Sequence, residues 1–599
     1  MEAIETTSPA LPVPTTLPAA PAVGPSSEED GSQTSFDVAL TRVDRAVYAA
    51  FARASAGGSP TALGLAWLDW ALQFACSPGK HYALAARVLA YWQSLMMGKP
   101  PDHVGNGDPR FDDAGWGHWP FSALRDTFAH VESFWEQATT GVRGVSPRNE
   151  QVMHFAARQC TDMLSPANCW WLNPQVLRAI VDTGGRNFFE GARNWLEDQE
   201  DLLAGRIPGS SIRRFAPHQL GRDVATTPGK VVYRSALIEL IQYEPLTPTV
   251  WHEPVLIVPS WILKYYILDL SPHDSLVRYL VDHGHTVFMI SWRNPRGEAR
   301  DLGLDDYLNM GLFDALAQVR RITDAPVHGV GYCLGGTLLA LGAAAHARAR
   351  RKEVAELKTI TLFAAQTDFS EPGELGLFVD ASRLAYLDAL MWEQGYLDGE
   401  QMAAAFQMLR SHDLIWSRLV REYLLGTRTQ PTDLMAWSAD TTRLPYRLHL
   451  ETLTHLYLHN DLAEGRYFVH GKPVHLGALK MPVFAVGAER DHVSPWHSVY
   501  KLHLLTDTEI GFVLASGGHN AGIVSEPGHA RRFRFRMRHK GEHYMSPPEW
   551  LEAAPAQQDS WWPCWQRWLA DRSSGPIAPP PIGAGTILGD APGTYVLEC

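Results

Sequence analysis

The sequence contains few cysteines, no long apolar run and no excess of positive charge. Six cysteines among 599 residues are too few for a disulfide framework, so we expect a reducing compartment. The longest apolar run, residues 337–345, has about half the length that a transmembrane helix needs, so we predict no transmembrane segment. The net charge of −13 gives no electrostatic basis for binding nucleic acid, which we therefore do not expect as a partner.

The composition and the first residues narrow the class of protein further. With 45% hydrophobic and 20% charged residues, the chain is typical of a globular protein and unlike a disordered chain, a collagen or a coiled coil. The first five residues include two glutamates and no basic residue, whereas an export signal has a positively charged region before an apolar core. We therefore predict a cytoplasmic protein.

Tryptophan is unusually frequent, with 21 in the chain. Packing beneath helices is the interpretation we favour, and an adhesive apolar surface is the alternative. The residues gather near the first helical segments and near the end of the chain: Trp67, Trp70, Trp92, Trp561, Trp562 and Trp565.

The chain divides into three predicted parts. Residues 1–35 are rich in proline, serine and threonine and poor in aromatic residues, which predicts a disordered tail. Residues 36–216 have apolar residues at helical spacing and predict a helical N-terminal domain. Within it, Ser165 and Pro166 have the pattern of a helix cap followed by proline at the first helical position. Residues 217–599 have a different pattern.

In this last part, short β-branched runs alternate with helical segments, which predicts a mostly parallel sheet buried on both faces. Between about residues 369 and 457 the strand pattern stops and helical, aromatic-rich sequence takes over. A long insertion between two strands of such a sheet is typical of a cap over an active site. The predicted strands are residues 231–243, 255–259, 286–291, 327–332, 359–365, 483–487 and 510–515.

The most informative motif follows the strand at 327–330 and precedes a helix of small residues at 337–347: Gly331-Tyr332-Cys333-Leu334-Gly335-Gly336. It has the form of the nucleophile elbow of the α/β-hydrolase fold, with cysteine in place of serine. The glycines are needed because the helix and a neighbouring strand pass close to the nucleophile. The helix N-terminus favours a thiolate at Cys333.

Two other interpretations of this motif are a buried structural cysteine and a dinucleotide-binding loop. The loop interpretation lacks the usual G-x-G-x-x-G spacing, and the next strand is followed by Gln366 instead of an acidic residue.

A nucleophile elbow predicts an acid and then a histidine, each in a loop after a later strand. Asp491 follows the strand at 483–487, and His519 follows the strand at 510–515. The predicted α/β-hydrolase domain therefore has the candidate catalytic residues Cys333, Asp491 and His519. Asp368 is the alternative acid and His492 the alternative base.

Two weaker patterns follow the predicted histidine. Residues 539–543 match the letters of a H-x-x-E-H zinc motif, but Gly541 interrupts the helix that the motif needs, so we predict no metal site. Residues 532–538 alternate arginine with apolar residues, which predicts a strand with arginine on one face. These arginines either contact solvent or help to hold an anionic substrate.

A cysteine nucleophile favours acyl transfer over hydrolysis. A thiolate that attacks a thioester exchanges one thioester for another, so the acyl group stays activated. The acyl-cysteine can then form an ester with an alcohol if a cap excludes water.

The elbow resembles the lipase-like box of polyhydroxyalkanoate synthases, and the resemblance covers about residues 150–570. The length and the helical N-terminal part resemble the class I enzymes of that family. Ser260, Leu263 and Asn520 depart from the family pattern and leave the monomer preference open. The other resembling blocks are residues 165–168, 264–270, 275–278, 284–288, 291–295, 491–496, 518–522 and 560–563.

The resemblance implies a role for each candidate residue. Cys333 carries the acyl group or growing chain, and His519 deprotonates the thiol and the incoming 3-hydroxyl group. Asp491 orients His519 or helps to activate that hydroxyl. The backbone amides of Leu334 and Ile262 are the implied oxyanion donors.

The resemblance also implies the substrate and the setting. The substrate would be an (R)-3-hydroxyacyl-CoA, the products a polyester and free CoA, with no cofactor beyond the CoA thioester. Members of the family work as homodimers on cytoplasmic granules. A cysteine hydrolase of the same fold and a catalytically silent granule protein are the competing hypotheses.

Overall fold

The computed structural model describes residues 35–54, 59–97, 107–203, 218–349, 354–528 and 530–598. The predicted disordered tail therefore lies outside the described residues, except for Ser35, the first residue of helix α1 (Ser35–Ala54). By packing, the chain divides into Met1–Val47 and Tyr48–Cys599. This division does not coincide with the predicted boundary at residue 216 between the helical domain and the α/β-hydrolase domain, which stays a prediction.

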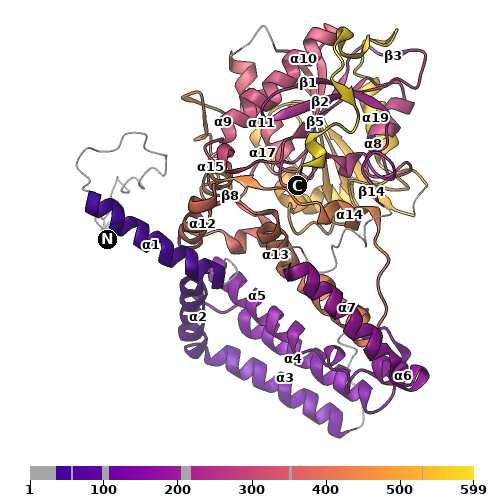
Figure 1. The fold of residues 1–599 in the computed structure, drawn as a ribbon. Helices are drawn as coiled ribbons and strands as arrows, with labels where there is room; N and C mark the ends of the chain where they lie inside the picture. Colours follow the sequence, from indigo (N-terminus) through magenta and orange to yellow (C-terminus); the bar gives the residue numbers. More distant parts are fainter. Residues whose placement is uncertain are drawn as a thin grey trace, which may run out of the picture. The chain divides into compact units, whose positions relative to one another are not determined.

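The N-terminal part of the second unit is helical, as predicted (Figure 1). Serine followed by proline begins several helices, because the serine side chain accepts a backbone N–H and proline needs none at the first position. The predicted cap at Ser165 is confirmed: its side chain accepts the amide of Ala167 at the start of a short 3₁₀ helix. The long helices are α2 (Pro60–Ala75), α3 (Pro78–Met96), α4 (Phe121–Thr139), α5 (Pro147–Met163), α6 (Pro174–Thr183) and α7 (Arg186–Leu203).

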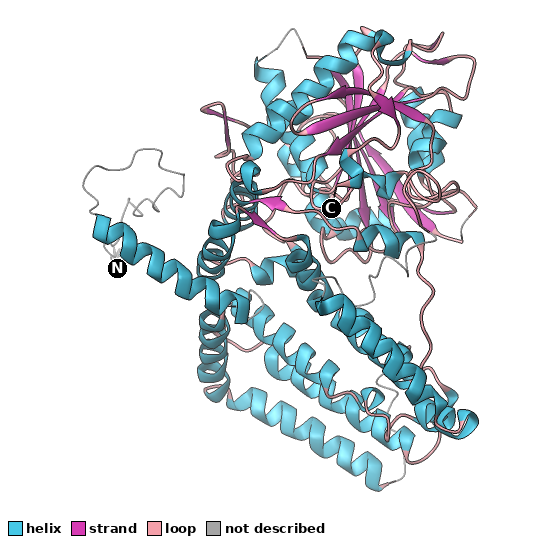
Figure 2. Ribbon diagram, in the orientation of Figure 1, coloured by secondary structure: helices cyan, strands magenta, loops and turns pink. Residues whose placement is uncertain are grey.

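An 11-stranded sheet forms the centre of the C-terminal part of the chain (Figure 2). Its middle strands are parallel and its edge strands antiparallel, in the order β15-β14-β13-β12-β7-β6-β4-β5-β2-β1-β17. The strands that matter for the site are β4 (Val255–Val258), β5 (Val287–Trp292), β6 (Val327–Tyr332), β7 (Leu357–Phe363), β12 (Val483–Ala488), β13 (Ile510–Ala515) and β14 (Arg532–Arg538).

The sheet is buried on both faces, as its continuous apolar runs predict. In β4, Val255 and Ile257 belong to one core cluster, whereas Leu256 and Val258 belong to the other. Helix α11 (Leu334–Ala349) covers one face, and helix α19 (Trp562–Ala570) covers the other. The fold is therefore the predicted α/β-hydrolase fold.

One predicted strand was wrong. Residues 231–243 form two antiparallel strands, β1 (Gly229–Arg234) and β2 (Ile238–Tyr243). The Ser235 hydroxyl accepts the amides of Leu237 and Ile238, both at 3.2 Å. A serine that binds the backbone in this way competes with strand pairing and makes a turn.

The insertion between β7 and β12 is mostly helical, as predicted for a cap. It contains α12 (Ala381–Gln394), α13 (Gly399–Leu409), α14 (Asp433–Ala439) and α15 (Tyr446–Glu451). The prediction of no strand was wrong in one detail, because Tyr396–Leu397 and Leu444–Pro445 form a short antiparallel pair.

Helix α7 holds the cap through buried polar contacts. The carboxylate of Asp198 is fully buried and accepts hydrogen bonds from Arg418, Arg428 and Tyr423 of the cap. Burial raises the pKa of Asp198, but the hydrogen bonds from Arg428 and Tyr423 outweigh it and the pKa is lowered. A Cβ on Gly191 would lie 1.8 Å from the Tyr423 carbonyl oxygen, so the backbones approach closely there.

Among the described residues, no helix is both long enough and apolar enough to cross a membrane.

Candidate active site

Cys333 lies at a sharp turn between β6 and α11. Its φ is +53°, in the left-handed region that a residue with a side chain seldom adopts. A Cβ on Gly331 would lie 2.3 Å from the Cα of Gly336, and one on Gly335 would lie 2.3 Å from the Val258 carbonyl oxygen. The elbow glycines are therefore needed for close packing of the backbone around Cys333.

Asp491 and His519 meet at the ends of two adjacent parallel strands, β12 and β13. The His519 Nδ1 and the Asp491 Oδ2 are 2.7 Å apart. The other oxygen of Asp491 accepts the amides of Val493 and Ser494 at 2.9 and 2.8 Å, so the buried carboxylate is fixed in place. Because the Nδ1 of His519 is bonded to this carboxylate, its Nε2 is the ring nitrogen that can bind Cys333.

The electrostatics of His519 reflect both neighbours. Burial by itself lowers the pKa of His519, but the negative charges of Asp491 and Cys333 and their hydrogen bonds outweigh it. The pKa of His519 is therefore raised well above its ordinary value. The structure thus brings Cys333, His519 and Asp491 together in the order expected of a nucleophile, a base and an orienting acid.

Two tyrosines next to these residues were missed by sequence reasoning. The Tyr332 hydroxyl donates to the Asn520 side chain at 2.5 Å, and its ring lies 5.6 Å from that of His519. Asn520, a departure from the family pattern, is therefore a hydrogen-bond acceptor next to the histidine. Burial raises the pKa of Tyr457, and the charge of Cys333 raises it further. Tyr332 belongs to the elbow motif, but no pattern in the sequence indicates its bond to Asn520, and none connects Tyr457 with the elbow.

The two predicted oxyanion donors lie on separate elements. Leu334 is the first residue of α11, where a backbone N–H has no acceptor within its own helix. The Ile262 amide lies in the loop after β4 and donates to the Ser260 hydroxyl at 3.3 Å. This long bond leaves the Ile262 amide weakly engaged.

Asp368, the alternative acid, and His492, the alternative base, make their hydrogen bonds with other residues. Asp368 accepts the amide of Ser370 at 2.8 Å and the side-chain amide of Asn460 at 3.2 Å. His492 lies in the turn after Asp491, and its carbonyl accepts the Glu374 amide. Burial lowers the pKa of His492. Neither Asp368 nor His492 hydrogen-bonds with His519 or Cys333 within the part of the chain that the structure describes.

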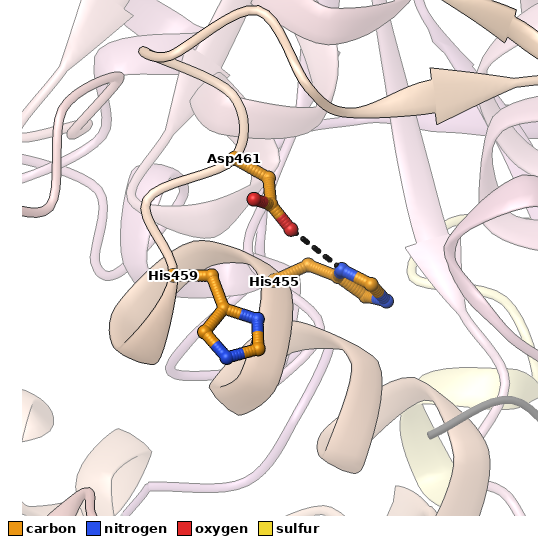
Figure 3. Close-up of side chains that lie close together, drawn as sticks. All are labelled: His455, His459 and Asp461. Carbon is orange, nitrogen blue, oxygen red and sulfur yellow. Dashed lines mark hydrogen bonds and ion pairs between the residues drawn. The ribbon is translucent and has the colours of Figure 1, made fainter. Parts of the chain in front are cut away.

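Two clusters of described residues have metal-binding residue types: His273, Asp274 and Asp433, and the cluster in Figure 3 of His455, His459 and Asp461. One oxygen of Asp461 is 2.8 Å from the His455 Nδ1, and the other accepts the Arg466 guanidinium at 3.1 Å. A paired arginine disfavours a metal cation at the same carboxylate. We therefore interpret the Asp461 cluster as a hydrogen-bonded ion-pair network.

The two weaker sequence patterns have structural explanations. Residues 539–543 form a turn instead of a helix, and Glu542 is bonded to Arg536, so no helix presents His539 and His543 together. The predicted arginine strand is β14. Its arginines bind backbone carbonyls or acidic side chains of the protein itself, which favours a structural role.

A cavity of about 310 Å³ lies beside the elbow. Ile262, Leu334 and Tyr457 line the end near Cys333, and side chains of α12 and α13 line the cap side. Leu334, the residue after Cys333, thus borders a partly open space between the elbow and the cap.

Comparisons with known families match three segments of the chain. Residues 107–280 match the poly-beta-hydroxybutyrate polymerase (PhaC) N-terminus, and residues 39–80 match the poly-beta-hydroxybutyrate polymerase N terminal family. Residues 253–526 match the alpha/beta hydrolase fold.

Two curated relatives are similar over most of their length. A poly(3-hydroxyalkanoate) polymerase of Methylorubrum extorquens is 37% identical over 497 residues, which cover 82% of this chain and 80% of the relative. A poly(3-hydroxyalkanoate) polymerase subunit of Cupriavidus necator is 32% identical over 590 residues, covering 95% and 98%. Among solved structures, a monoacylglycerol lipase of Paleococcus ferrophilus is 12% identical with a TM-score of 0.31, covering 56% of this chain and 99% of the lipase.

Proposed function

Since the chain belongs to the poly(3-hydroxyalkanoate) polymerase family, we propose that it polymerises (R)-3-hydroxyacyl-CoA through an acyl-cysteine on Cys333 and releases CoA. The observation that carries this proposal is the juxtaposition of Cys333 with the His519–Asp491 pair at the carboxyl ends of adjacent strands. The polymerase is an acyltransferase, and the proposal assigns its chemistry to these residues.

The first step is acylation. The Cys333 thiol gives its proton to the His519 Nε2, and the sulfur attacks the thioester carbonyl of the substrate. A new carbon–sulfur bond forms on Cys333 as the bond to the CoA sulfur breaks. His519 then gives the proton to the departing thiolate, so free CoA leaves. One thioester replaces another, and the acyl group remains activated.

The second step is ester formation. His519 takes the proton of a 3-hydroxyl group, and the hydroxyl oxygen attacks the acyl-Cys333 carbonyl. An ester forms, the bond to the Cys333 sulfur breaks, and the proton returns to the sulfur. Asp491 holds the Nδ1 of His519 through both steps, which stabilises the imidazolium. For each unit added, one thioester is consumed and one ester is made.

The carbonyl oxygen becomes negatively charged in both steps. The Leu334 amide, at the N-terminus of α11, is the first donor to this oxygen, and the Ile262 amide is the second. The weak bond from Ile262 to Ser260 supports this assignment, since an oxyanion is a stronger acceptor than a hydroxyl.

The test is an incubation with (R)-3-hydroxybutyryl-CoA, with free thiol and insoluble polyester measured together. We expect CoA release with polymer in the wild type and neither in Cys333→Ala. Soluble hydroxyacid without polymer would favour the cysteine hydrolase. Full polymer formation by Cys333→Ala would contradict the proposed nucleophile. No CoA release would leave a substrate with a longer chain, or the silent granule protein, as the remaining hypotheses.

The proposal includes a homodimer at the surface of cytoplasmic granules. The family membership supports it, as do apolar side chains exposed on the N-terminal helices, among them Trp67 and Trp92. Sedimentation of the purified protein with and without substrate tests the dimer. Fractionation of polyester-producing cells tests the granule location.

A further inference from the structure

Cys333 and His519 follow two strands that are not neighbours in the sheet. Cys333 follows β6 and His519 follows β13, and strands β7 and β12 lie between them. Because neighbouring strands are about 4.8 Å apart, β6 and β13 are separated by about 14 Å. The sheet therefore fixes each segment separately, and the distance from the sulfur to the imidazole depends on the contacts that join the two segments.

One hydrogen bond between side chains joins these segments. Tyr332 immediately precedes Cys333, and Asn520 immediately follows His519. The Tyr332 hydroxyl donates to the Asn520 side-chain oxygen at 2.5 Å. Among the described residues, no other hydrogen bond between side chains links the elbow to the loop at residues 517–524, apart from the contact of the sulfur with the imidazole itself.

The other contacts of the loop after His519 come from residues that follow it in the chain. The Trp561 indole donates to the Gly522 carbonyl at 2.9 Å, and the Arg531 guanidinium donates to the Val524 carbonyl at 2.6 Å. Both donors hold the loop against the C-terminal part of the fold and neither contacts the elbow. The position of the loop relative to the elbow therefore depends on the bond from the tyrosine.

The surroundings of Tyr332 suit a fixed donor. Its side chain is 2% exposed and packs in the same core cluster as Ile523 and Val524 of the loop. Burial raises the pKa of Tyr332 well above its ordinary value, and the negative charges of Cys333 and Asp491 raise it further. The phenol therefore keeps its proton at neutral pH and donates to a neutral acceptor.

We propose that Tyr332 and Asn520 are positioning residues for the reaction, and that their hydrogen bond sets the distance between the Cys333 sulfur and the His519 imidazole. Without this bond, the loop after His519 can shift away from the elbow, and the thiol gives its proton to the imidazole less readily. The inference rests on the roles of Cys333 and His519 in the proposed function. It also gives Asn520, a departure from the family pattern, a task in this chain.

The first test measures the reactivity of Cys333 without substrate. The full-length protein is treated with iodoacetamide at about pH 6 and at about pH 9.5, and peptide mass spectrometry follows the alkylation of Cys333. At the lower pH, fast alkylation needs a thiolate that the His519 imidazolium stabilises, whereas at the higher pH a thiol ionises by itself. Tyr332→Phe and Asn520→Leu should each slow alkylation about fivefold at the lower pH and less than about twofold at the higher pH.

The second test measures CoA release from (R)-3-hydroxybutyryl-CoA at several substrate concentrations. For both single variants, kcat should fall about tenfold, which is part of the roughly hundredfold or more that a general base contributes. KM should change less than about twofold, because neither side chain is assigned to substrate binding.

A double variant separates positioning from packing. Tyr332→Phe with Asn520→Leu removes both polar groups, so neither a donor nor an acceptor is left unpaired in the core. Its stability towards urea should recover towards that of the wild type, whereas its kcat should stay as low as that of the single variants. A purely structural role predicts that stability and kcat recover together.

Tyr91→Phe is the matched control. Tyr91 is 8% exposed in α3, and its hydroxyl is hydrogen-bonded to that of Thr127 in α4 at 2.8 Å. The variant removes the same atom and the same kind of bond away from the proposed catalytic residues. Alkylation of Cys333 and kcat should therefore stay within about twofold of the wild type. Circular dichroism of all variants checks that the fold is kept.

The outcomes separate this inference from the proposed function. If the wild type releases no CoA, but Cys333 is alkylated fast at the lower pH and Tyr332→Phe slows it, the proposed function fails and the positioning role stands. Slow alkylation of the wild type at the lower pH would mean that Cys333 is not paired with His519, and both would fall.

Three results would overturn the positioning role alone. Unchanged alkylation and kcat in both single variants would mean that the bond only packs the core. Equal slowing of alkylation at both pH values would indicate altered access to Cys333. Recovery of kcat by the double variant would show that stability, and not the hydrogen bond, controls the rate.

Discussion

The two tryptophan-rich regions of this chain differ in their surroundings. Trp561, Trp562 and Trp565 are at most 1% exposed, whereas Trp67 and Trp92 are more than half exposed. The C-terminal residues lie on or next to α19, which packs on a sheet that supplies both apolar side chains and backbone acceptors. The helices α2 and α3 have no such sheet beneath them. The same residue type therefore has a different role, depending on what covers it.

The buried tryptophans also support the active site. The indole N–H of Trp561 donates to the Gly522 carbonyl at 2.9 Å, and that of Trp562 donates to the Ile523 carbonyl at 3.0 Å. Both carbonyls lie in the loop that follows His519. The C-terminal tryptophans thus help to hold the loop that follows the proposed base, whereas Trp67 and Trp92 are exposed on α2 and α3.

Removing the central buried ring should have the largest effect on stability. Trp565 is fully buried, lies 5.0 Å from the Phe363 ring and donates to the Thr361 hydroxyl at 3.0 Å. Trp565→Ala should lower the free energy of unfolding by about 3–5 kcal/mol, since it leaves a cavity and an unpaired hydroxyl. Urea unfolding followed by circular dichroism measures this. A loss below about 1 kcal/mol would mean that the buried C-terminal tryptophans stabilise the fold no more than the exposed N-terminal ones do.

The buried ion pairs of α7 should have the next largest effect. Asp198→Asn leaves the arginines of the cap without their buried partner and should cost about 3 kcal/mol. Because the pKa of Asp198 is lowered on folding, its contribution is present above pH ~4 and is lost as the pH falls through the folded value.

Unfolding of wild type and Asp198→Asn between pH 3 and pH 7, measured by urea titration, checks both statements. Glu190→Gln is the control on the same helix, because Glu190 pairs with arginines at the surface and should cost less than about 1 kcal/mol. Equal costs for the two variants would show that α7 is not held to the cap by its buried contacts.

A smaller effect is expected from Trp561→Phe. The ring remains, but the hydrogen bond to the loop after His519 is lost, at a cost of about 1 kcal/mol in stability. We expect kcat for polymer formation to fall several-fold with KM little changed, because the loop is less well positioned. Steady-state CoA release at several substrate concentrations separates the two constants. An unchanged kcat would mean that the tryptophan only packs.

The smallest effect is expected at the exposed tryptophans. Trp67→Gln and Trp92→Gln remove rings that contribute little to the core, so stability should change by no more than about 0.5 kcal/mol. Thermal unfolding of the purified variants measures this. Trp70 offers a comparison on the same helix, because its indole donates to the Ala138 carbonyl at 2.8 Å and its loss should cost more.

Much of the catalytic fold could be predicted because its signals are local. Strands β6 and β13 have the predicted bounds, and the elbow glycines at 331, 335 and 336 are needed for the close approach that the motif implies. The hairpin at Ser235 was missed because no glycine, proline or asparagine marks the turn between its two strands. The turn depends on a side chain that binds its own backbone.

Part of the candidate site could also be predicted, because some of its residues have local signals in the sequence. Asp491 and His519 follow recognisable strands, so their order along the chain indicated them. Tyr332 and Tyr457 were not singled out, because their relation to the site depends on contacts between segments far apart in the sequence. The ion pairs between α7 and the cap link residues more than 200 positions apart and have no local pattern.

The sequence by itself determined the alternation of strands and helices, the strained elbow and the order of nucleophile, acid and histidine. These depend on periodicity, on glycine and on chain order, which are properties of short segments. Only the tertiary structure decided which tryptophans are buried, how α7 holds the cap, and that a cavity lies between the elbow and the cap. These features depend on burial and on paired charges, and both exist only after distant segments have packed together.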